Sequence, residues 1–179
     1  LQAAVQNDGR ILGMRARMFS DLGAFQIHGS FLSPDNACKR ITGPYDIQDV
    51  DQLMLGVITN KPPMGPYRGA GQPEVSIMME RLLDLIATEL AMDPVEVRIK
   101  NLVRPEQFPY TTAGGVTIDS GNYHAALQRA LDVAEYDRWR ADQASARGRD
   151  SGKLLGIGVA TTASGSGGSG AVAARSSFA

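Results

Sequence analysis

The chain has 179 residues, 43% of them hydrophobic, which is enough to bury a sizeable core. Its net charge of −1 gives no electrostatic basis for binding nucleic acid or an anionic membrane, and no apolar run approaches the length of a membrane span. Cys38 is the only cysteine and His28 and His124 are the only histidines, which excludes an internal disulfide and a Cys/His cluster for zinc or iron–sulfur.

The first part of the chain predicts a β-hairpin followed mainly by loops. Residues 1–5 and 11–19 are strand candidates joined by Asn7-Asp8-Gly9, residue types that tolerate the positive φ of a hairpin turn. Scattered Gly, Pro, Asn and Asp between residues 20 and 51 show little periodicity and favour loops with short strands. Residues 52–59 are rich in Leu, Val and Ile and form the next strand candidate.

Helices are predicted after residue 73. Residues 74–92 carry apolar side chains at steps of three and four, which indicates a helix with one buried face. Its apolar positions are Val75, Met78, Met79, Leu82, Leu83, Ile86 and Leu90. Asp93-Pro94-Val95-Glu96 has the pattern of a helix start, and the helix that follows is expected to turn Val95, Ile99 and Leu102 inward.

A third helix is predicted to begin at an Asp119 or Ser120 cap and to turn polar beyond Trp139. Its expected inner face consists of Tyr123, Leu127, Ala130, Leu131 and Ala134. Residues 147–153 have the composition of a linker, and residues 153–160 are a further strand candidate. The pattern as a whole predicts an α+β fold, with mixed β-strands and packed helices.

Residues 66–74, Pro-Tyr-Arg-Gly-Ala-Gly-Gln-Pro-Glu, are the strongest candidate for a functional site. Gly69 and Gly71 lack a Cβ and allow a sharp turn and the close approach of a bound group. Arg68 places a permanent cation in that turn, and Pro73 fits the first turn of a helix. Such a turn can bind an oxyanion or a metal-oxo group. The alternative from the spacing alone is a helix start with an incidental arginine.

Tyr67-Arg68-Gly69-Ala70-Gly71-Gln72-Pro73-Glu74 resembles the Tyr-Arg-Gly-Ala-Gly-Arg-Pro-Glu signature of the xanthine dehydrogenase/aldehyde oxidase family, in its carbon monoxide dehydrogenase-like form. The resemblance extends in order over about residues 5 to 160. Further matching segments include Asp8-Gly9-Arg10, Asp21-Leu22-Gly23-Ala24-Phe25, Thr59-Asn60-Lys61-Pro62-Pro63, Asp93-Pro94-Val95-Glu96, Arg98-Ile99-Lys100-Asn101-Leu102 and Asp119-Ser120-Gly121.

The resemblance implies a molybdopterin-binding domain of the molybdenum hydroxylase type. Tyr67, Arg68, Gly69, Ala70 and Gly71 would contact the cofactor, molybdopterin in its cytosine dinucleotide form, whose dithiolene holds the molybdenum, so no protein ligand to the metal is expected. Ala70 and Asn36 would line the substrate pocket. The general-base glutamate of the family is expected outside this chain, so no catalytic residue is assigned here.

The loop also departs from two branches of the family. Gly69 stands where copper-containing carbon monoxide dehydrogenases carry a cysteine, and Ala70 stands where xanthine dehydrogenases carry a phenylalanine. Cys38 lies thirty residues before Arg68 and would need a fold-back to approach this site. Gln72 replaces the usual arginine of the signature.

The implied function is oxidative hydroxylation of an aldehyde or N-heterocycle with water as the oxygen source, by a large subunit of which this chain is a part. Residues 1–146 would be the C-terminal part of a first molybdopterin-binding domain, 147–153 a linker and 154–179 the start of a second. The resemblance further implies a cytoplasmic hetero-oligomer with partner subunits carrying 2Fe-2S clusters and FAD, and a periplasmic location stays open.

Two alternatives stay open at this point. The chain could be a non-catalytic scaffold or interaction domain with a degraded cofactor site, because Gln72 and the absence of a glutamate near Ser164 depart from the family. The segment Ser164-Gly165-Ser166-Gly167-Gly168-Ser169-Gly170 could be a flexible linker or a backbone nest for the cofactor.

Overall fold

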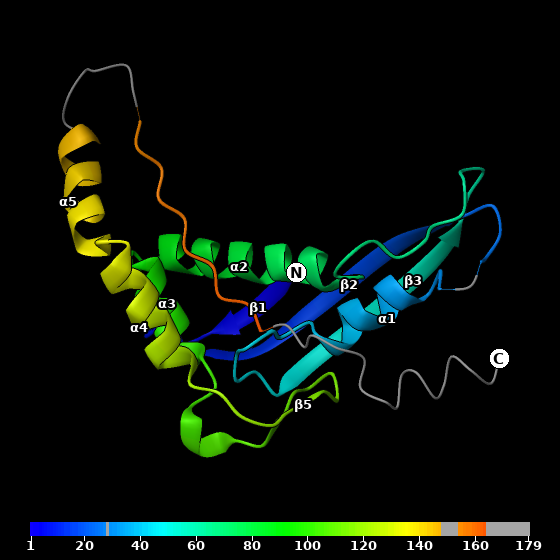
Figure 1. Cartoon of the computed structure of the whole chain (residues 1–179), viewed down its shortest axis with the longest axis horizontal. Coiled ribbons are helices and arrows are strands. Elements are labelled where there is room, and N and C mark those ends of the chain that lie inside the picture. The colour runs from blue at the N-terminus through cyan, green and yellow to red at the C-terminus, as the bar shows by residue number, and fades with distance from the viewer. Residues whose placement is uncertain (28, 148–153, 164–179) are drawn as a thin grey trace.

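The computed structural model describes residues 1–27, 29–147 and 154–163 and has the predicted α+β fold (Figure 1). The strands are β1 (Gln2–Val5), β2 (Ile11–Gly23), β3 (Asp49–Ile58), β4 (Tyr110–Thr111) and β5 (Thr117–Ile118). The helices are α1 (Leu32–Lys39), α2 (Gln72–Glu89), α3 (Pro94–Asn101), α4 (Tyr123–Val133) and α5 (Tyr136–Arg147), with a short 3-10 helix, η1 (Pro105–Gln107). None of the described helices has the length and apolar character that a membrane span requires.

The main sheet has the order β1-β2-β3, with β1 antiparallel and β3 parallel to the central strand β2. The predicted hairpin is confirmed: Gly9 has a φ of 90°, and the Gln6 N–H donates to the Arg10 carbonyl at 2.9 Å across the turn. The next predicted strand is also confirmed, although β3 starts three residues earlier than expected, at Asp49. Its parallel pairing with β2 extends the ladder to that residue.

One face of the sheet packs against α2. Met14, Ala16 and Met18 alternate along β2 as buried residues and join the same hydrophobic core as Val75 and Met79 of α2. Figure 1 shows α2 lying across this face. The alternation along β2 and the helical spacing along α2 therefore bury two complementary surfaces against each other.

Helix α1 was not predicted from the sequence, which favoured loops here. It is short, its N-cap residue Phe31 makes no side-chain cap, and only Pro34 and Ala37 are buried. These features leave almost no apolar periodicity to detect. The helix is held by its contact with the start of α2, which lies over thirty residues further along the chain.

Helix α2 confirms the predicted apolar face, but it begins at Gln72 and ends at Glu89, three residues before the expected end. The chain leaves the helix at Ala91, whose φ is 52°. Pro73 occupies the first turn, as predicted. The sequence pattern did not reveal that Glu80, on the same helix, is also buried, with 8% of its surface exposed.

Helix α3 begins as predicted, because the Asp93 carboxylate accepts a hydrogen bond from the Val95 N–H at 2.8 Å. Val95 and Leu102 are buried as expected, whereas the prediction for Ile99 was wrong, since this side chain is 38% exposed. Arg98 turns inward instead. Its inward position is stabilised by carboxylates on α2.

The third predicted helix is two helices, and its predicted cap was wrong. Asn122, and neither Asp119 nor Ser120, caps α4 by accepting from the Ala125 N–H at 2.9 Å. The chain then breaks at Glu135, whose φ is 52°, before α5 starts. Within the predicted inner face Leu127 is buried and Tyr123 and Leu131 are partly buried, but Ala130 and Ala134 are exposed.

Residues 154–163 form no strand, so the strand predicted over residues 153–160 was wrong for its described part. This segment follows α5 and crosses α2 (Figure 1), where side chains and not a sheet ladder supply its hydrogen-bond partners. The predicted linker over residues 147–153 lies outside the described residues except for its first residue, and so do His28 and residues 164–179.

A buried ionic cluster joins α2 and α3. The Arg98 guanidinium is fully buried and donates to the Glu80 carboxylate at 2.8 Å and to the Asp84 carboxylate at 3.0 Å. Glu80 also accepts from the Tyr45 hydroxyl at 2.6 Å. Burial, with the negative charge of Glu80 beside it, raises the pKa of Tyr45, so the hydroxyl stays protonated as the donor.

Replacing Arg98 by alanine is expected to lower the free energy of unfolding by about 3–5 kcal/mol, because Glu80 would stay buried without its cation. Urea denaturation followed by circular dichroism measures this change. Arg138→Ala is the control, since it removes an arginine that is 67% exposed and pairs with Glu135 on the surface. A surface pair contributes little, so equal losses in the two variants would contradict a stabilising role for the buried cluster.

Candidate functional site

The loop of residues 67–71 lies between the segment that follows β3 and the start of α2, and its backbone has an unusual conformation. Gly69, Ala70 and Gly71 have consecutive positive φ values of 101°, 42° and 89°. The Ala70 N–H donates to the Tyr67 carbonyl at 2.7 Å, and the Gln72 N–H donates to the Gly69 carbonyl at 3.1 Å. Glycine adopts a positive φ readily, but the φ of 42° at Ala70 is costly unless the surroundings hold this residue there, which marks the loop as a constrained element.

The segment between β3 and this loop is also held in place by hydrogen bonds. The Ala24 N–H donates to the Lys61 carbonyl at 2.9 Å, and the Met64 N–H donates to the Leu22 carbonyl at 3.2 Å. The Ser30 hydroxyl donates to the Met64 carbonyl at 2.9 Å. These bonds fix the segment between β3 and the loop to the end of β2 and to Ser30, and the three prolines of this segment further limit its conformations.

Gly71 is required by close packing as well as by its φ. A Cβ at this position would lie 1.9 Å from the Ser33 carbonyl oxygen and 3.0 Å from the Ala37 nitrogen, both in α1. At Gly69 a Cβ would lie 2.7 Å from the Pro73 ring. Helix α1 therefore supports the loop from one side, and only glycine lets the two backbones approach so closely.

Tyr67 and Arg68 project from the loop into solvent, and Tyr67 is 89% exposed. Among the described residues no carboxylate forms an ion pair with Arg68. The loop leads directly into the N-terminal end of α2, an 18-residue helix with a partial positive charge at this end. A cation and a helix N-terminus thus share one exposed surface, which favours an anionic ligand.

Ala70 and Asn36, the predicted substrate-pocket residues, belong to segments that the fold brings together. Ala70 precedes Gly71, and Asn36 lies on α1 between the two residues whose backbones contact Gly71. The assignments of Tyr67, Arg68, Gly69, Ala70 and Gly71 to the cofactor, and of Ala70 and Asn36 to a substrate, stay predictions.

Cys38 also lies on α1, which packs against the loop, so the chain does make the fold-back that Cys38 would need to approach this site. Its side chain packs against the hydrophobic core. Burial, followed by the negative charge of Asp35, raises the pKa of the Cys38 thiol. The Cys38 thiol is half-buried against the core, and its raised pKa disfavours the thiolate form that a metal would bind.

Sequence reasoning missed a row of polar side chains on α2 that bind residues 161–163. Gln72, Ser76 and Glu80 are spaced by four residues and lie on one face of the helix. The recurrence of polar residues at this step was the available signal, but the stronger apolar pattern of the same helix masked it. This row begins at the residue that directly follows the loop.

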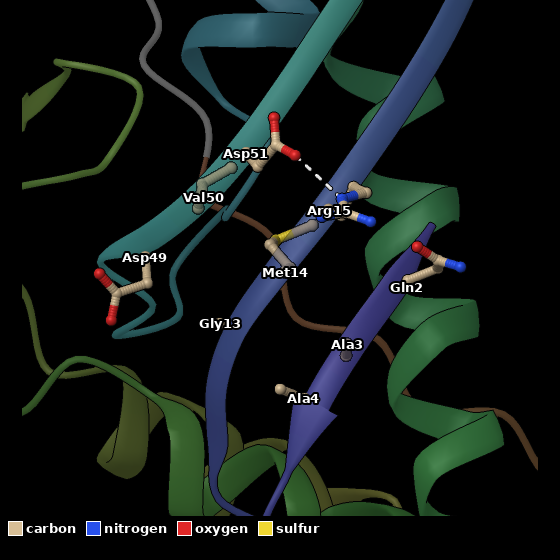
Figure 2. A pocket seen from close by; sticks show the side chains of 9 residues that line it. All are labelled: Gln2, Ala3, Ala4, Gly13, Met14, Arg15, Asp49, Val50 and Asp51. Atoms are coloured by element: carbon tan, nitrogen blue, oxygen red, sulfur yellow. Dashed lines mark hydrogen bonds and ion pairs between the residues drawn. The ribbon is translucent and has the colours of Figure 1, made fainter.

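A groove along the main sheet is a second surface feature (Figure 2). It has a volume of about 520 Å³ and is lined in part by Ala4, Gly13 and Val50. Figure 2 shows its charged rim, where Arg15 donates to Asp51 at 2.9 Å. Because Arg15, the one cation of the groove's lining, is already paired with Asp51, the groove offers no free cation, unlike the loop. Within the described residues no cluster of three or more His, Cys, Asp or Glu side chains is arranged to hold a metal ion.

Comparisons with known proteins point to one family. A family model described as the molybdopterin cofactor-binding domain matches residues 1–102. The carbon monoxide dehydrogenase large chain of Hydrogenophaga pseudoflava is 42% identical over 164 residues, which cover 89% of this chain and 20% of that protein. The nicotine 6-hydroxylase large subunit of Paenarthrobacter nicotinovorans is 31% identical over 170 residues, which cover 93% of this chain and 20% of that protein.

Solved structures agree with this result. The structure of quinoline 2-oxidoreductase from Pseudomonas putida 86 matches with a TM-score of 0.76 and 33% sequence identity, over 82% of this chain and 19% of that one. The chain therefore spans about a fifth of the length of the relatives it matches.

The Gly71→Ala variant tests the packing of the loop against α1. It is expected to destabilise the protein by at least about 2 kcal/mol more than Gly115→Ala, because of the added overlap with α1. Gly115 is a matched control, since its φ is also positive, at 81°, but a Cβ there would meet no atom within 4 Å. Chemical denaturation of both variants gives the difference in free energy of unfolding, and equal losses would show that α1 does not constrain the loop.

Proposed function

The chain belongs to the molybdopterin cofactor-binding domain family, and on this basis we propose that the whole protein is the large subunit of a molybdenum hydroxylase. Its proposed reaction is the oxidative hydroxylation of an aldehyde or an N-heterocycle, with water as the oxygen source. The observation that carries the proposal is the constrained loop of residues 67–71, which combines Arg68 with the N-terminal end of α2.

The residues of the loop fit an anionic molybdenum cofactor. Arg68 offers guanidinium donors without a carboxylate partner among the described residues, and Gly69 presents no side chain to a bound group. When bound, the molybdenum pterin supplies the redox chemistry. Arg68 would donate hydrogen bonds to its oxygen atoms, while the fixed backbone of residues 69–71 would hold that donor in place. The cytosine dinucleotide form of the cofactor is part of this proposal.

Substrate preference is proposed from Ala70 and the similar proteins. The small Ala70 side chain leaves room beside the loop without an aromatic wall for a purine, and Asn36 on α1 would line the same region. The names of two similar proteins refer to nicotine and quinoline, which are N-heterocycles. These features together favour an aromatic or heterocyclic substrate.

Carbon monoxide oxidation is the competing reaction, because one similar protein with 42% identity is a carbon monoxide dehydrogenase large chain. Copper requires a soft thiolate ligand, and Gly69 stands where the copper-containing branch carries its cysteine. Cys38 is packed against the core and does not replace it. The residues of this loop therefore favour the organic substrate.

The proposed assembly is a cytoplasmic hetero-oligomer. Similar proteins are named as a large chain and a large subunit, which supports an assembly with other subunits. We expect these partners to carry 2Fe-2S clusters and FAD, and we expect the general-base glutamate elsewhere in the large subunit. The domain division at residues 147–153, with a second molybdopterin-binding domain starting at residue 154, belongs to the same proposal.

A non-catalytic scaffold is the alternative, and it rests on Gln72 in place of the usual arginine. In this structure the Gln72 side chain donates a hydrogen bond to the Ala163 carbonyl at 2.8 Å. A glutamine at this position therefore still makes a hydrogen bond to a neighbouring segment. The molybdenum content of the purified full-length protein separates the two functions, since a scaffold with a degraded site would contain no stoichiometric metal.

Substrate profiling tests the proposed reaction. The full-length complex, assayed with a dye as electron acceptor, is expected to oxidise members of a panel of aromatic aldehydes and N-heterocycles, but neither carbon monoxide nor xanthine. Elemental analysis of the same preparation is expected to show molybdenum without copper. Turnover of carbon monoxide with stoichiometric copper and no activity on the organic panel would contradict the proposal.

Replacing Arg68 by lysine is expected to lower kcat about a hundredfold, because lysine keeps the charge but loses the planar arrangement of donors. Molybdenum content should stay near that of the wild-type complex, since the pterin keeps its other contacts. Arg81→Lys, at an exposed position further along α2, is the matched control and should leave kcat unchanged. An unchanged kcat in Arg68→Lys would show that Arg68 belongs only to the start of the helix and has no role in turnover.

A further inference from the structure

Three polar side chains of α2 bind three consecutive residues of the segment that crosses this helix. The Glu80 carboxylate accepts from the Thr161 N–H at 3.0 Å, and the Ser76 and Thr162 hydroxyls lie 3.4 Å apart. The Gln72 side-chain amide donates to the Ala163 carbonyl at 2.8 Å. The segment therefore runs antiparallel to α2, toward its N-terminal end, and two of the three contacts are to backbone atoms.

Glu80 anchors one end of this contact row. Its carboxylate is held by the Arg98 guanidinium at 2.8 Å and by the Tyr45 hydroxyl at 2.6 Å, and both partners are fully buried. Its position is therefore set by α3 and by the segment before β3, independently of residues 161–163. A carboxylate fixed in this way is a preorganised acceptor for the Thr161 N–H.

Gln72 lies at the other end and connects two segments. Its backbone N–H donates to the Gly69 carbonyl at 3.1 Å within the loop, while its side chain donates to the Ala163 carbonyl at 2.8 Å. One residue thus binds the loop through its backbone and the crossing segment through its side chain. Displacement of either segment must strain a hydrogen bond of Gln72.

We propose that Gln72 is a positioning residue that couples the loop of residues 67–71 to residues 161–163, with Glu80 as the fixed end of the same row. The coupling depends on the side-chain amide of Gln72 as a hydrogen-bond donor. The resembled signature has arginine at this position, which also carries donors, so the two residue types can serve the same purpose. The effect of this coupling on cofactor retention rests on the proposed function of the loop.

Gln72→Glu in the full-length protein tests the coupling. The glutamate has the same shape but places a carboxylate, which cannot donate, against the Ala163 carbonyl. A negative charge in the first turn is favourable for α2, so the helix itself is expected to stay intact. Peptide-level hydrogen exchange should become about tenfold faster in the peptides that contain residues 67–71 and 154–163, as expected for the loss of one hydrogen bond.

Two further variants define the outcome. Gln72→Arg restores a donor and is expected to return exchange in both peptides to near the wild-type rate. Gln6→Glu introduces the same change at an exposed position in the turn between β1 and β2 and should leave both peptides unaffected. Unchanged exchange in Gln72→Glu, acceleration in only one of the two peptides, or no rescue by Gln72→Arg would overturn the proposal.

Molybdenum analysis of the same preparations keeps this inference separate from the proposed function. With both correct, Gln72→Glu loses metal on gel filtration, while the wild type and Gln72→Arg retain it. Metal retained in full by Gln72→Glu despite faster exchange in both peptides would overturn the role in cofactor positioning. Absence of metal from the wild type, together with the predicted exchange pattern, would refute the proposed function and leave the coupling supported.

Discussion

The arrangement of the described chain depends on the hydrogen bonds and the ion pair that surround the buried Glu80 carboxylate. A buried carboxylate is tolerated only when donors surround it, and here they come from three separate parts of the chain: Tyr45, Arg98 and the Thr161 N–H. Each donor fixes one segment relative to α2. The stability of this cluster and the path of residues 161–163 are therefore consequences of one buried charge.

Helix α2 carries this constraint to the candidate site. Its middle holds the ionic cluster, its apolar face packs on the main sheet, and its N-terminal end supports the loop of residues 67–71. The loop is further confined by α1, whose backbone leaves no space for a side chain at Gly71. A loop that holds Ala70 at a costly positive φ is thus attached to a packed helix, an arrangement that suits a binding site in which donors must stay in position.

Local features of the fold could be predicted from the sequence, and long-range features could not. The hairpin at Asn7-Asp8-Gly9, the cap at Asp93 and the apolar face of α2 each depend on residues close together in the chain. Helix α1 was missed because its stability comes from contact with α2 and not from its own pattern. The break between α4 and α5 was missed because Glu135 adopts a positive φ that its residue type does not favour.

For the candidate site, the sequence by itself determined the family resemblance, the glycines that the loop requires and the position of Arg68. Only the tertiary structure decided that α1 supports the loop, that Cys38 faces the core, and that Gln72 and Glu80 bind residues 161–163. Periodicity and capping report interactions within about one turn of helix or one hairpin. The bond between Glu80 and Thr161 joins residues 81 positions apart, so it exists only once the whole topology has placed them side by side.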